Sequence, residues 1–257
     1  MAIDTAVIPC GGMGTRLRPI TEWIPKELLP VALRPLLFWT LDEAADAGLR
    51  RAIVVTNPGK PILEAAARRY GPRLEVACVP QDHPRGLGDA LMRARPLLGG
   101  DPFVALLPDN LFKGPNPTAA VLDVHQRTSL ATVLLAEISR ADAETKGATG
   151  RAVVRRLPDG ELRVTSVADK GSGRFDTGGS DVAVTPIGRF AFHGNVFEEF
   201  ADVARTLAEG AELDDVPVLQ RLSSRGELAG VLNPARFYDV GVPEGYHEAV
   251  ADFPPHS

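Results

Sequence analysis

The sequence predicts one α/β domain in which helices flank a mixed, largely parallel central sheet. Over residues 1–140, short apolar runs typical of buried strands alternate with segments whose apolar residues recur at helical spacing. Repeated strand–helix–strand units of this length imply right-handed crossovers between parallel strands. The chain has 257 residues, 44% of them hydrophobic, so it can bury a sizeable core. Because no linker or internal repeat divides it, we expect a single domain over 1–257.

The expected elements of the first half follow one another in a regular order. The run 52–55 is continuous and β-rich, as in a strand that is buried on both faces. Gly48 is placed to end the helix before it, and Asn116 and Pro117 are placed to cap and start a later helix. We expect strands at 6–9, 52–55, 74–79, 103–107 and 131–135, and helices at 36–45, from 61 onward, at 87–94 and at 117–128.

The second half has a different pattern. A Pro-Asp-Gly turn at 158–160 separates two β-rich runs and predicts a hairpin. The segment 170–181 is rich in Gly, Ser, Thr and Asp, which predicts a loop. We interpret Asp214 and Asp215 as a helix start, where negative charge is favoured. The expected hairpin strands are 151–156 and 162–167, the expected helices are 196–208 and 215–223, and further strands are expected from 228 and near 237.

Composition excludes several classes of protein. With 28 basic and 33 acidic residues the net charge is -5, which argues against a nucleic-acid-coating surface or an anionic-membrane anchor. Cys10 and Cys78 lie in apolar runs and form no C-x-x-C pair, so neither a disulfide framework nor a zinc site is expected. There is no basic leader before a long apolar stretch, and no apolar run approaches roughly 18 residues. We therefore expect a soluble, cytoplasmic protein with no nucleic-acid or membrane partner.

Three polar clusters follow predicted strands. They occupy 11–16, 81–88 and 109–110, after the first, third and fourth strands. In open α/β sheets, ligands bind at the carboxyl ends of the strands. We therefore expect these clusters, far apart in the sequence, to be neighbours in space and to form the functional site.

The cluster that contains Gly11, Gly12 and Gly14 has the character of an anion-binding loop. Adjacent glycines let the backbone turn sharply and present N–H groups to a phosphate. The spacing fits neither the dinucleotide fingerprint G-x-G-x-x-G nor a P-loop, so a nicotinamide-dependent oxidoreductase is not expected. An ordinary glycine turn is the alternative, but Thr15-Arg16 and the later Lys26 put two cations nearby. A loop that binds a triphosphate is the favoured interpretation.

The segments 7–9, 11–17 and 24–31 together resemble the start of the sugar-1-phosphate nucleotidyltransferases. The phrase Ile-Pro-Lys-Glu at 24–27 and Gly-Leu-Gly at 86–88 are similar to the bacterial UDP-glucose pyrophosphorylase branch. The likeness extends to Tyr-Asp-Val-Gly at 238–241 and so covers nearly the whole chain. It implies a Rossmann-like fold of the nucleotide-diphospho-sugar transferase type. It also implies a nucleotide-binding half over 1–140 and a sugar-binding half over 141–257.

The resemblance also implies an activity. Such enzymes join a nucleoside triphosphate to a sugar 1-phosphate and release pyrophosphate, with Mg²⁺ as the cofactor. UTP and glucose 1-phosphate are the first expectation. Thymidylyl transfer, or transfer to an unusual sugar or cyclitol phosphate, is the alternative within this class. A non-catalytic, nucleotide-sugar-binding regulatory subunit is the alternative from another class. A homo-oligomer, either a dimer or a tetramer, is also implied.

The resemblance assigns roles around the nucleotide. Arg16 would hold the β- and γ-phosphates, and Lys26 would stabilise the charge that develops on the α-phosphate. Gln81 resembles the glutamine that pairs with the edge of a pyrimidine base, and the backbone at Gly86 would close on the base from its other side. The glycine loop, with Thr15, would bind the phosphates.

Two aspartates match the family's metal ligands. Asp109 ends an apolar strand, and Asp239 lies in the segment 238–241. Magnesium prefers one or two carboxylates together with phosphates and water, so this pair suffices.

The sugar side is implied by the segment 167–170. Lys170 would grip the sugar phosphate, and Asp169 stands where the family has a glutamate that bonds sugar hydroxyls. Because aspartate is one methylene shorter, the identity of the sugar is open here. Gly150 is the expected point of backbone approach to the sugar, with Gly147 as the competing position.

Overall fold

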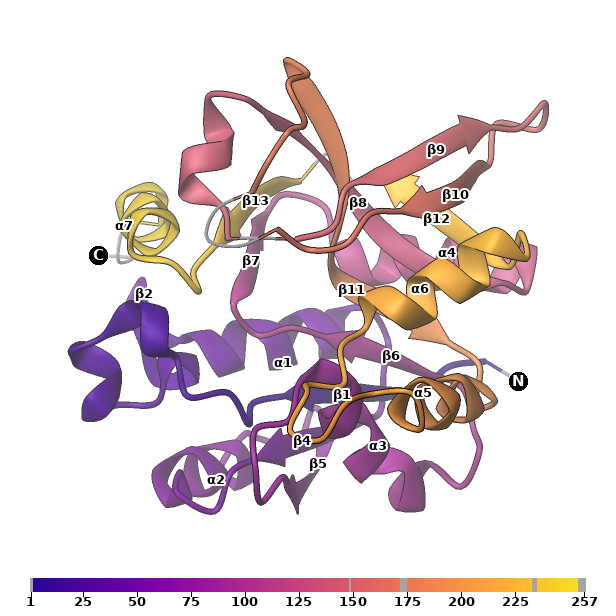
Figure 1. Ribbon diagram of the computed structural model, residues 1–257. Coiled ribbons are helices and arrows are strands. Elements are labelled where there is room, and N and C mark those ends of the chain that lie inside the picture. Colours follow the sequence, from indigo (N-terminus) through magenta and orange to yellow (C-terminus); the bar gives the residue numbers. More distant parts are fainter. Residues whose placement is uncertain (1, 148, 172–174, 233–234, 254–257) are drawn as a thin grey trace.

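The computed structural model describes residues 2–147, 149–171, 175–232 and 235–253. Within these residues a large sheet forms the centre of the molecule (Figure 1). Its nine strands are β1 (Thr5–Pro9), β4 (Arg51–Thr56), β5 (Glu75–Pro80), β6 (Phe103–Leu106), β8 (Ala131–Ser139), β9 (Ala152–Arg156), β10 (Leu162–Val167), β11 (Val182–Phe192) and β12 (Leu228–Leu232). They are ordered β5-β4-β1-β6-β11-β8-β12-β10-β9.

Short ribbons and helices complete the described part of the chain. Antiparallel pairs join β7 (Asn110–Lys113) to β13 (Arg236–Asp239), and β2 (Pro30–Val31) to β3 (Arg34–Pro35). The α-helices are α1 (Leu36–Asp46), α2 (Pro61–Arg68), α3 (Leu87–Leu98), α4 (Pro117–Thr128), α5 (Val196–Ala204), α6 (Val216–Ser224) and α7 (Pro243–Asp252). The 3-10 turns are η1 (Thr15–Leu17), η2 (Ile20–Glu22), η3 (Lys26–Leu28) and η4 (Asp142–Thr145). Of these described helices, none has the length and apolar character needed to cross a membrane.

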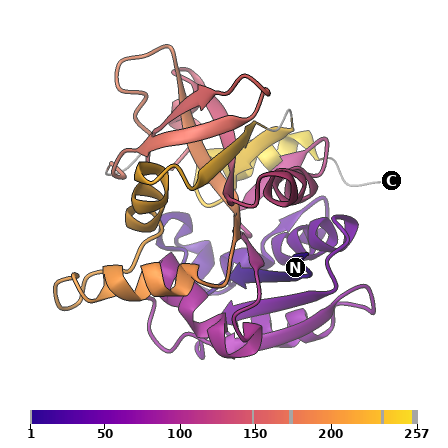
Figure 2. The ribbon, with the colours of Figure 1, turned by 90° about the vertical axis from the view of Figure 1, so that its right-hand side faces the viewer.

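The expected mixed α/β architecture is confirmed. Strands β5, β4, β1 and β6 are parallel neighbours, and β8 and β12 form a further parallel pair. The other pairings are antiparallel, and β9 also meets β11 at Ala152 and Val184. Figures 1 and 2 show the parallel strands of the first half in the lower part and the antiparallel strands of the second half above them. Strand β11 runs between these two parts.

The side chains of β1 point alternately to the two faces of the sheet and pack into two separate layers of the core. Val7 packs with residues of α3 and α5 on one face of the sheet. Ala6 and Ile8 point to the other face and pack with residues of α1, α2 and α4. Successive side chains of a strand point to opposite faces, so a continuous apolar strand such as β1 needs helices on both sides. The parallel half is therefore a three-layer sandwich that holds the carboxyl ends of its strands at one edge.

Strand β11 is the main element that the sequence patterns did not predict. We expected a loop at 170–181 and predicted no strand in the segment that follows it. Its sequence contains Pro186 and Gly188, which normally interrupt strands. The structure accommodates both residues through a shift of register between Pro186 and Phe190. Helix α5 also ends at Ala204, four residues before the predicted position 208.

A buried ion pair fastens β11 to α1. The side chain of Arg189 is 1% exposed and donates to both carboxylate oxygens of Glu43, at 2.7 and 2.6 Å. The same guanidinium donates to the carbonyl oxygens of Leu107 and Asn110, at 2.9 and 3.0 Å. Because these two carbonyls flank Asp109, Arg189 fixes the path of the chain that carries a predicted site residue.

Candidate active site

The polar clusters that follow β1, β5 and β6 meet at one edge of the sheet, as predicted. A β-carbon placed on Gly11 would lie 1.9 Å from Oε1 of Gln81, so the first two clusters are in direct contact. The side chain of Lys26 lies against Gly14, and its ammonium forms an ion pair with the carboxylate of Asp109, so Lys26 connects the first cluster to the third. These contacts follow from the parallel order of the strands, which brings their carboxyl ends together.

Residues 10–14, called the glycine loop below, leave β1 with a turned backbone. Gly14 has a φ of 64°, in the left-handed region that glycine adopts without steric cost. Thr21 donates its hydroxyl to the Gly14 carbonyl at 2.8 Å and closes the end of the loop. Within the described residues, the N–H groups of Gly11, Gly12 and Met13 donate to no protein acceptor. Such free donors fit a phosphate group.

The ion pair between Lys26 and Asp109 sets the charge of the site. Burial lowers the pKa of Lys26, but attraction to Asp109 and Glu27 outweighs burial and leaves this pKa raised. Burial also acts to raise the pKa of Asp109, and here the Lys26 ammonium outweighs it and holds the pKa below its usual value. Both groups are therefore charged at neutral pH.

Asp239 lies beside Asp109 because the β7–β13 ladder places it opposite Asn110. Its carboxylate accepts from the backbone N–H of Gly147 at 2.6 Å and of Gly241 at 3.1 Å. One oxygen of each aspartate lies 3.1 Å from the point that a β-carbon on Gly241 would occupy. Burial and then repulsion by Asp109 raise the pKa of Asp239.

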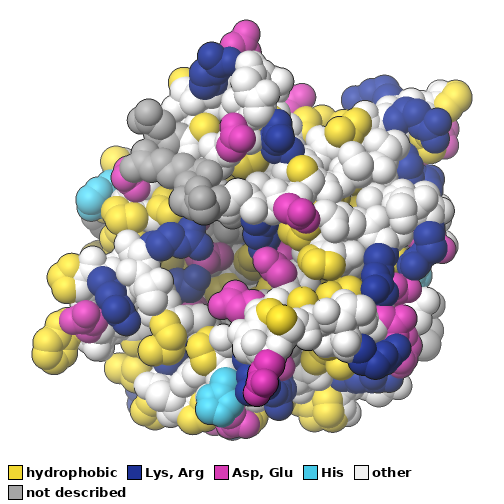
Figure 3. Space-filling model, in the orientation of Figure 1, with side chains coloured by type: hydrophobic (Ala, Val, Ile, Leu, Met, Phe, Trp, Pro, Cys, Tyr) yellow, Lys and Arg dark blue, Asp and Glu magenta, His cyan; other side chains and the backbone are white. Residues whose placement is uncertain are grey.

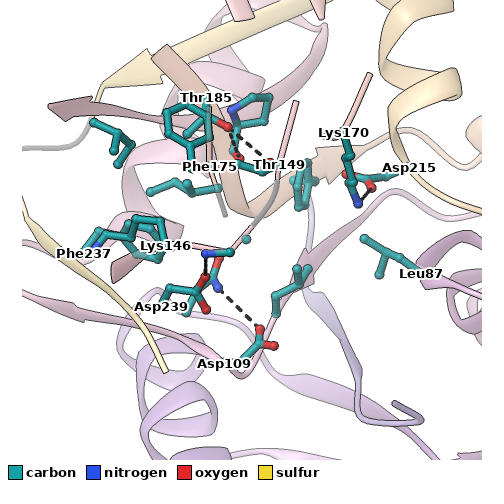
Figure 4. A pocket seen from close by; sticks show the side chains of 18 of the residues that line it. Leu87, Asp109, Lys146, Thr149, Lys170, Phe175, Thr185, Asp215, Phe237 and Asp239 are labelled. Atoms are coloured by element: carbon teal, nitrogen blue, oxygen red, sulfur yellow. Dashed lines mark hydrogen bonds and ion pairs between the residues drawn. The ribbon is translucent and has the colours of Figure 1, made fainter. Parts of the chain in front are cut away.

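A divalent cation would relieve the repulsion between these two carboxylates. Figure 4 shows Asp109 and Asp239 close together at the lower wall of a cavity. No cluster of three or more His, Cys, Asp or Glu ligands occurs in the part of the chain that the structure describes. Two carboxylates without further protein ligands fit Mg²⁺, which keeps positions for phosphate oxygens and water.

The cavity has a volume of about 150 Å³ and is lined from both halves of the chain. Arg16 and Asp109 come from the first half, and Gly147, Lys170 and Asp239 come from the second. A β-carbon on Gly147 would lie 2.2 Å from Nη1 of Arg16, so the guanidinium lies directly against that backbone. Figure 3 shows charged side chains of both signs around a hollow near the centre of this face.

Lys170 lies on the side of the cavity opposite the aspartate pair (Figure 4), where two further carboxylates hold it. Its ammonium donates to Asp214 at 2.7 Å and to Asp215 at 3.1 Å. Burial lowers the Lys170 pKa, but the two aspartates outweigh burial and raise it. The helix-start interpretation fits Asp215, the N-cap of α6, but it did not foresee this ion pair. The neighbouring Asp169 accepts from Gln220 at 2.8 Å.

Gln81 and Gly86, the two residues predicted at the base, lie together. The Gln81 amide donates to the Gly86 carbonyl at 3.2 Å and to Asp89 at 2.8 Å. Gly86 has a φ of 95°, and a β-carbon there would lie 2.4 Å from the carbonyl oxygen of Leu213. The close approach of Leu213 and the positive φ both require glycine at this position.

Of the two glycines considered for the sugar, Gly147 faces the cavity. Gly147 and Thr149 line it, whereas Gly150 is not among its lining residues in the described part of the chain. A β-carbon on Gly150 would lie 2.3 Å from the carbonyl oxygen of Ala168. The close contact of Gly150 is therefore with the chain next to Asp169.

Sequence reasoning missed Lys60 and Glu27, which form a buried ion pair beneath the glycine loop. Lys60 follows β4, whose carboxyl end lies at the same edge of the sheet as that of β1. Applying the strand-end rule to β4, the second predicted strand, could have found Lys60. Nothing in the sequence alone links it to Glu27.

Comparison with known proteins identifies the family of this chain. A family model described as nucleotidyl transferase matches residues 5–254. The chain belongs to this nucleotidyl transferase family. The resemblance stated from the sequence is therefore confirmed, and the protein is an enzyme of the nucleotidyltransferase class.

Relatives of this nucleotidyltransferase match it over nearly its full length. The UTP–glucose-1-phosphate uridylyltransferase of Pseudomonas aeruginosa is 26% identical, over 96% of this chain and 94% of the relative. A crystal structure of UDP-glucose pyrophosphorylase complexed with UDP-glucose has a TM-score of 0.81, 25% identity and 98% coverage of both chains. The UTP-bound pyrophosphorylase of Acinetobacter baumannii has the same fold, with a TM-score of 0.81, 21% identity and coverage of 98% and 93%.

Proposed function

We propose that this enzyme transfers a uridylyl group from UTP to glucose 1-phosphate or a related sugar 1-phosphate and releases pyrophosphate. The observation that carries the proposal is that three kinds of group lie in or directly beside one cavity: Arg16, Asp109 and Asp239 line it, Lys26 pairs with Asp109, and the glycine loop lies against Lys26 at Gly14. They are the free N–H groups of the glycine loop, the cations Arg16 and Lys26, and the carboxylates Asp109 and Asp239. The similarity to uridylyltransferases over nearly the whole chain supports UTP and glucose 1-phosphate as substrates.

The reaction requires two anions to be held in line. An oxygen of the sugar phosphate attacks the α-phosphorus, and a new P–O bond forms. The bond from the α-phosphorus to the oxygen that bridges to the β-phosphorus breaks, and its electron pair leaves with pyrophosphate. Because both reactants are negatively charged, the protein mainly positions them and offsets their repulsion.

Each cation has a separate part in the proposal. Arg16 binds the β- and γ-phosphates, and Lys26 moves its ammonium from Asp109 to the α-phosphate, where negative charge develops. The free N–H groups of the glycine loop bind phosphate oxygens. Asp109 and Asp239 would hold Mg²⁺, which would supply positive charge to offset the negative charge of the phosphates.

Specificity for base and sugar is assigned to two further groups of residues. The contact between Gln81 and Gly86 supports a shared role at a pyrimidine base. Lys170 is proposed to bind the sugar phosphate, and Asp169 with the backbone at Gly147 is proposed to bind sugar hydroxyls. Because Asp169 has a shorter side chain than the family's glutamate, the proposal includes sugars other than glucose.

A pyrophosphate-release assay with Mg²⁺ tests the proposal. Each common nucleoside triphosphate is paired with a panel of sugar 1-phosphates that includes glucose 1-phosphate. Release that requires both partners is expected, with UTP and glucose 1-phosphate as the best pair. A best pair containing dTTP would replace the uridylyl assignment. Tight binding of nucleotide sugars without turnover for any pair would favour a regulatory role and overturn the proposal.

A further inference from the structure

The buried ammonium of Lys60 is hydrogen-bonded to the backbone of the glycine loop. It is the residue before α2 and is only 8% exposed. Its ammonium donates to the carbonyl oxygens of Cys10 and Gly12, at 2.8 and 2.5 Å. It also donates to both carboxylate oxygens of Glu27, at 3.1 and 3.0 Å. A lysine has three N–H donors and no acceptor, so these contacts use all of its donors.

The two carbonyl contacts determine where the adjoining N–H groups point. In a planar trans peptide, the C=O of one residue and the N–H of the next point in opposite directions. Because Lys60 draws in the carbonyl oxygens of Cys10 and Gly12, the N–H groups of Gly11 and Met13 point away from it. In the described residues, neither of these N–H groups has a protein acceptor. The lysine thus keeps two donors of the loop available to a ligand.

The Glu27 contact extends this effect to a second part of the site. Glu27 is 1% exposed, so its position is fixed by burial and by the pair with Lys60. It lies in η3 directly after Lys26, which pairs with Asp109. One buried ammonium therefore ties the glycine loop to the turn that carries Lys26. Since Glu27 neutralises Lys60, the lysine contributes orientation to the site and little net charge.

We propose that Lys60 is a positioning residue for the nucleotide. It turns two carbonyls of the glycine loop inward, so that the N–H groups of Gly11 and Met13 are preorganised for the phosphates of the triphosphate. This inference rests on the proposed function, because it takes a nucleoside triphosphate as the ligand. It predicts that loss of Lys60 weakens nucleotide binding and leaves sugar-phosphate binding unchanged.

The test uses the double variant Lys60→Met/Glu27→Gln, which removes the lysine without leaving a buried carboxylate unpaired. Binding of UTP in the presence of Mg²⁺ is measured by isothermal titration calorimetry, and KM is measured for each substrate. We expect the Kd and KM for UTP to rise about tenfold, as for the loss of one hydrogen bond to a charged group. We expect the KM for glucose 1-phosphate to be unchanged.

Leu63→Ala is the matched control. Leu63 lies in the same helix, α2, is fully buried in the core, and has an apolar side chain that makes none of the polar contacts of Lys60. Its truncation lowers the melting temperature without changing the contacts of Lys60. We expect the folded Leu63→Ala variant to bind UTP as tightly as the wild type does. If the double variant does not fold, Lys60→Arg replaces it. This variant keeps the charge beside Glu27 but alters the donors to the two carbonyls, so its KM for UTP is also expected to rise.

The outcomes separate this inference from the proposed function. A folded Lys60 variant that binds UTP as tightly as the wild type overturns the positioning role, even if the enzyme reacts as proposed. A Leu63→Ala variant that loses the same affinity also overturns it, because loss of stability alone would then explain the effect. Wild-type protein that binds UTP without transferring it contradicts the proposed function but leaves the Lys60 test intact. Wild-type protein that binds no nucleoside triphosphate overturns both.

Discussion

Replacement of Arg189 by methionine tests the buried ion pair that joins β11 to α1. The change leaves the Glu43 carboxylate, 13% exposed, with the hydroxyl of Thr118, at 2.5 Å, as its remaining donor among the described residues. Removing one partner of a buried ion pair costs about 3–5 kcal/mol. The carbonyls of Leu107 and Asn110 each lose a donor, at about 1 kcal/mol each.

The expected loss for Arg189→Met is therefore at least about 5 kcal/mol of unfolding free energy. For a chain of this length, that corresponds to a fall in melting temperature of about 10 °C. Urea denaturation and thermal denaturation, both followed by far-UV circular dichroism, measure these quantities. The double variant Arg189→Met/Glu43→Gln should lose less, because it leaves no uncompensated charge. Arg68→Met breaks an exposed ion pair with Glu64 and should cost about 0.5 kcal/mol or less.

Two results would refute this reasoning. If Arg189→Met stays within about 1 kcal/mol of the wild type, the network of Arg189 is not a major source of stability. If the double variant is as unstable as the single variant, the loss comes from packing and not from the stranded carboxylate. Either result would also weaken the argument that Arg189 fixes the chain around Asp109.

Three further predictions concern the site. Lys26→Met should lower the rate of pyrophosphate release at least about 100-fold. The control Lys113→Met, which breaks an exposed ion pair with Asp252, should leave this rate unchanged. Equal rates for the wild type and both variants would contradict the role of Lys26. Asp239→Asn should raise the Mg²⁺ concentration for half-maximal activity about tenfold, and an unchanged Mg²⁺ titration would point to other ligands. Burial raises the pKa of Asp215 from 3.8 to about 7. The folded state therefore binds this proton more tightly than the unfolded chain does. Because the folded state still holds the proton between about pH 4 and about pH 7, where the unfolded chain has lost it, the free energy of unfolding should fall as the pH rises over this range. Asp215→Asn should flatten this decline in urea denaturation at several pH values, and a profile with the same slope would exclude Asp215 as its source.

The parallel half of the fold could be predicted because each of its elements has a clear local pattern. The run at 52–55 is continuous and apolar, and β4 spans Arg51–Thr56. Pro117 after Asn116 starts α4 as expected, with the Asn116 side chain accepting from the N–H of Ala119. Such signals depend on the nearest residues alone, so they can be recognised in the sequence without the tertiary structure.

In the second half, the hairpin strands β9 and β10, helix α6 and strand β12 follow local patterns and are confirmed, whereas β11 and α7 depend on long-range contacts and were not predicted. Strand β11 contains Pro186 and Gly188, and it persists because neighbouring strands pair with it on both sides of the shift in register. Helix α7 begins at Pro243 and contains Gly245, which weakens the local helical signal.

The candidate site likewise combines residues that local motifs predict with contacts that depend on the tertiary structure. The family motifs pointed to Arg16, Lys26, Asp109 and Asp239; three of these residues line the cavity, and Lys26 pairs with Asp109 beside it. The partners of Lys170 were not foreseen, because Asp214 is 44 residues further along the chain. Ion pairs of this kind depend on the packing of α6 against β10, which no local pattern reports.

The passage of β11 through both parts of the sheet has a consequence for how the enzyme can move. Residues 189–192 of β11 pair with β6 of the parallel part, and residues 182–186, together with Phe190 and Ala191, pair with β8. A hinge that swung one half as a rigid body would have to break hydrogen bonds along this shared strand. The sheet thus forms one continuous frame, and we expect the movements that accompany ligand binding to involve the loops at its rim.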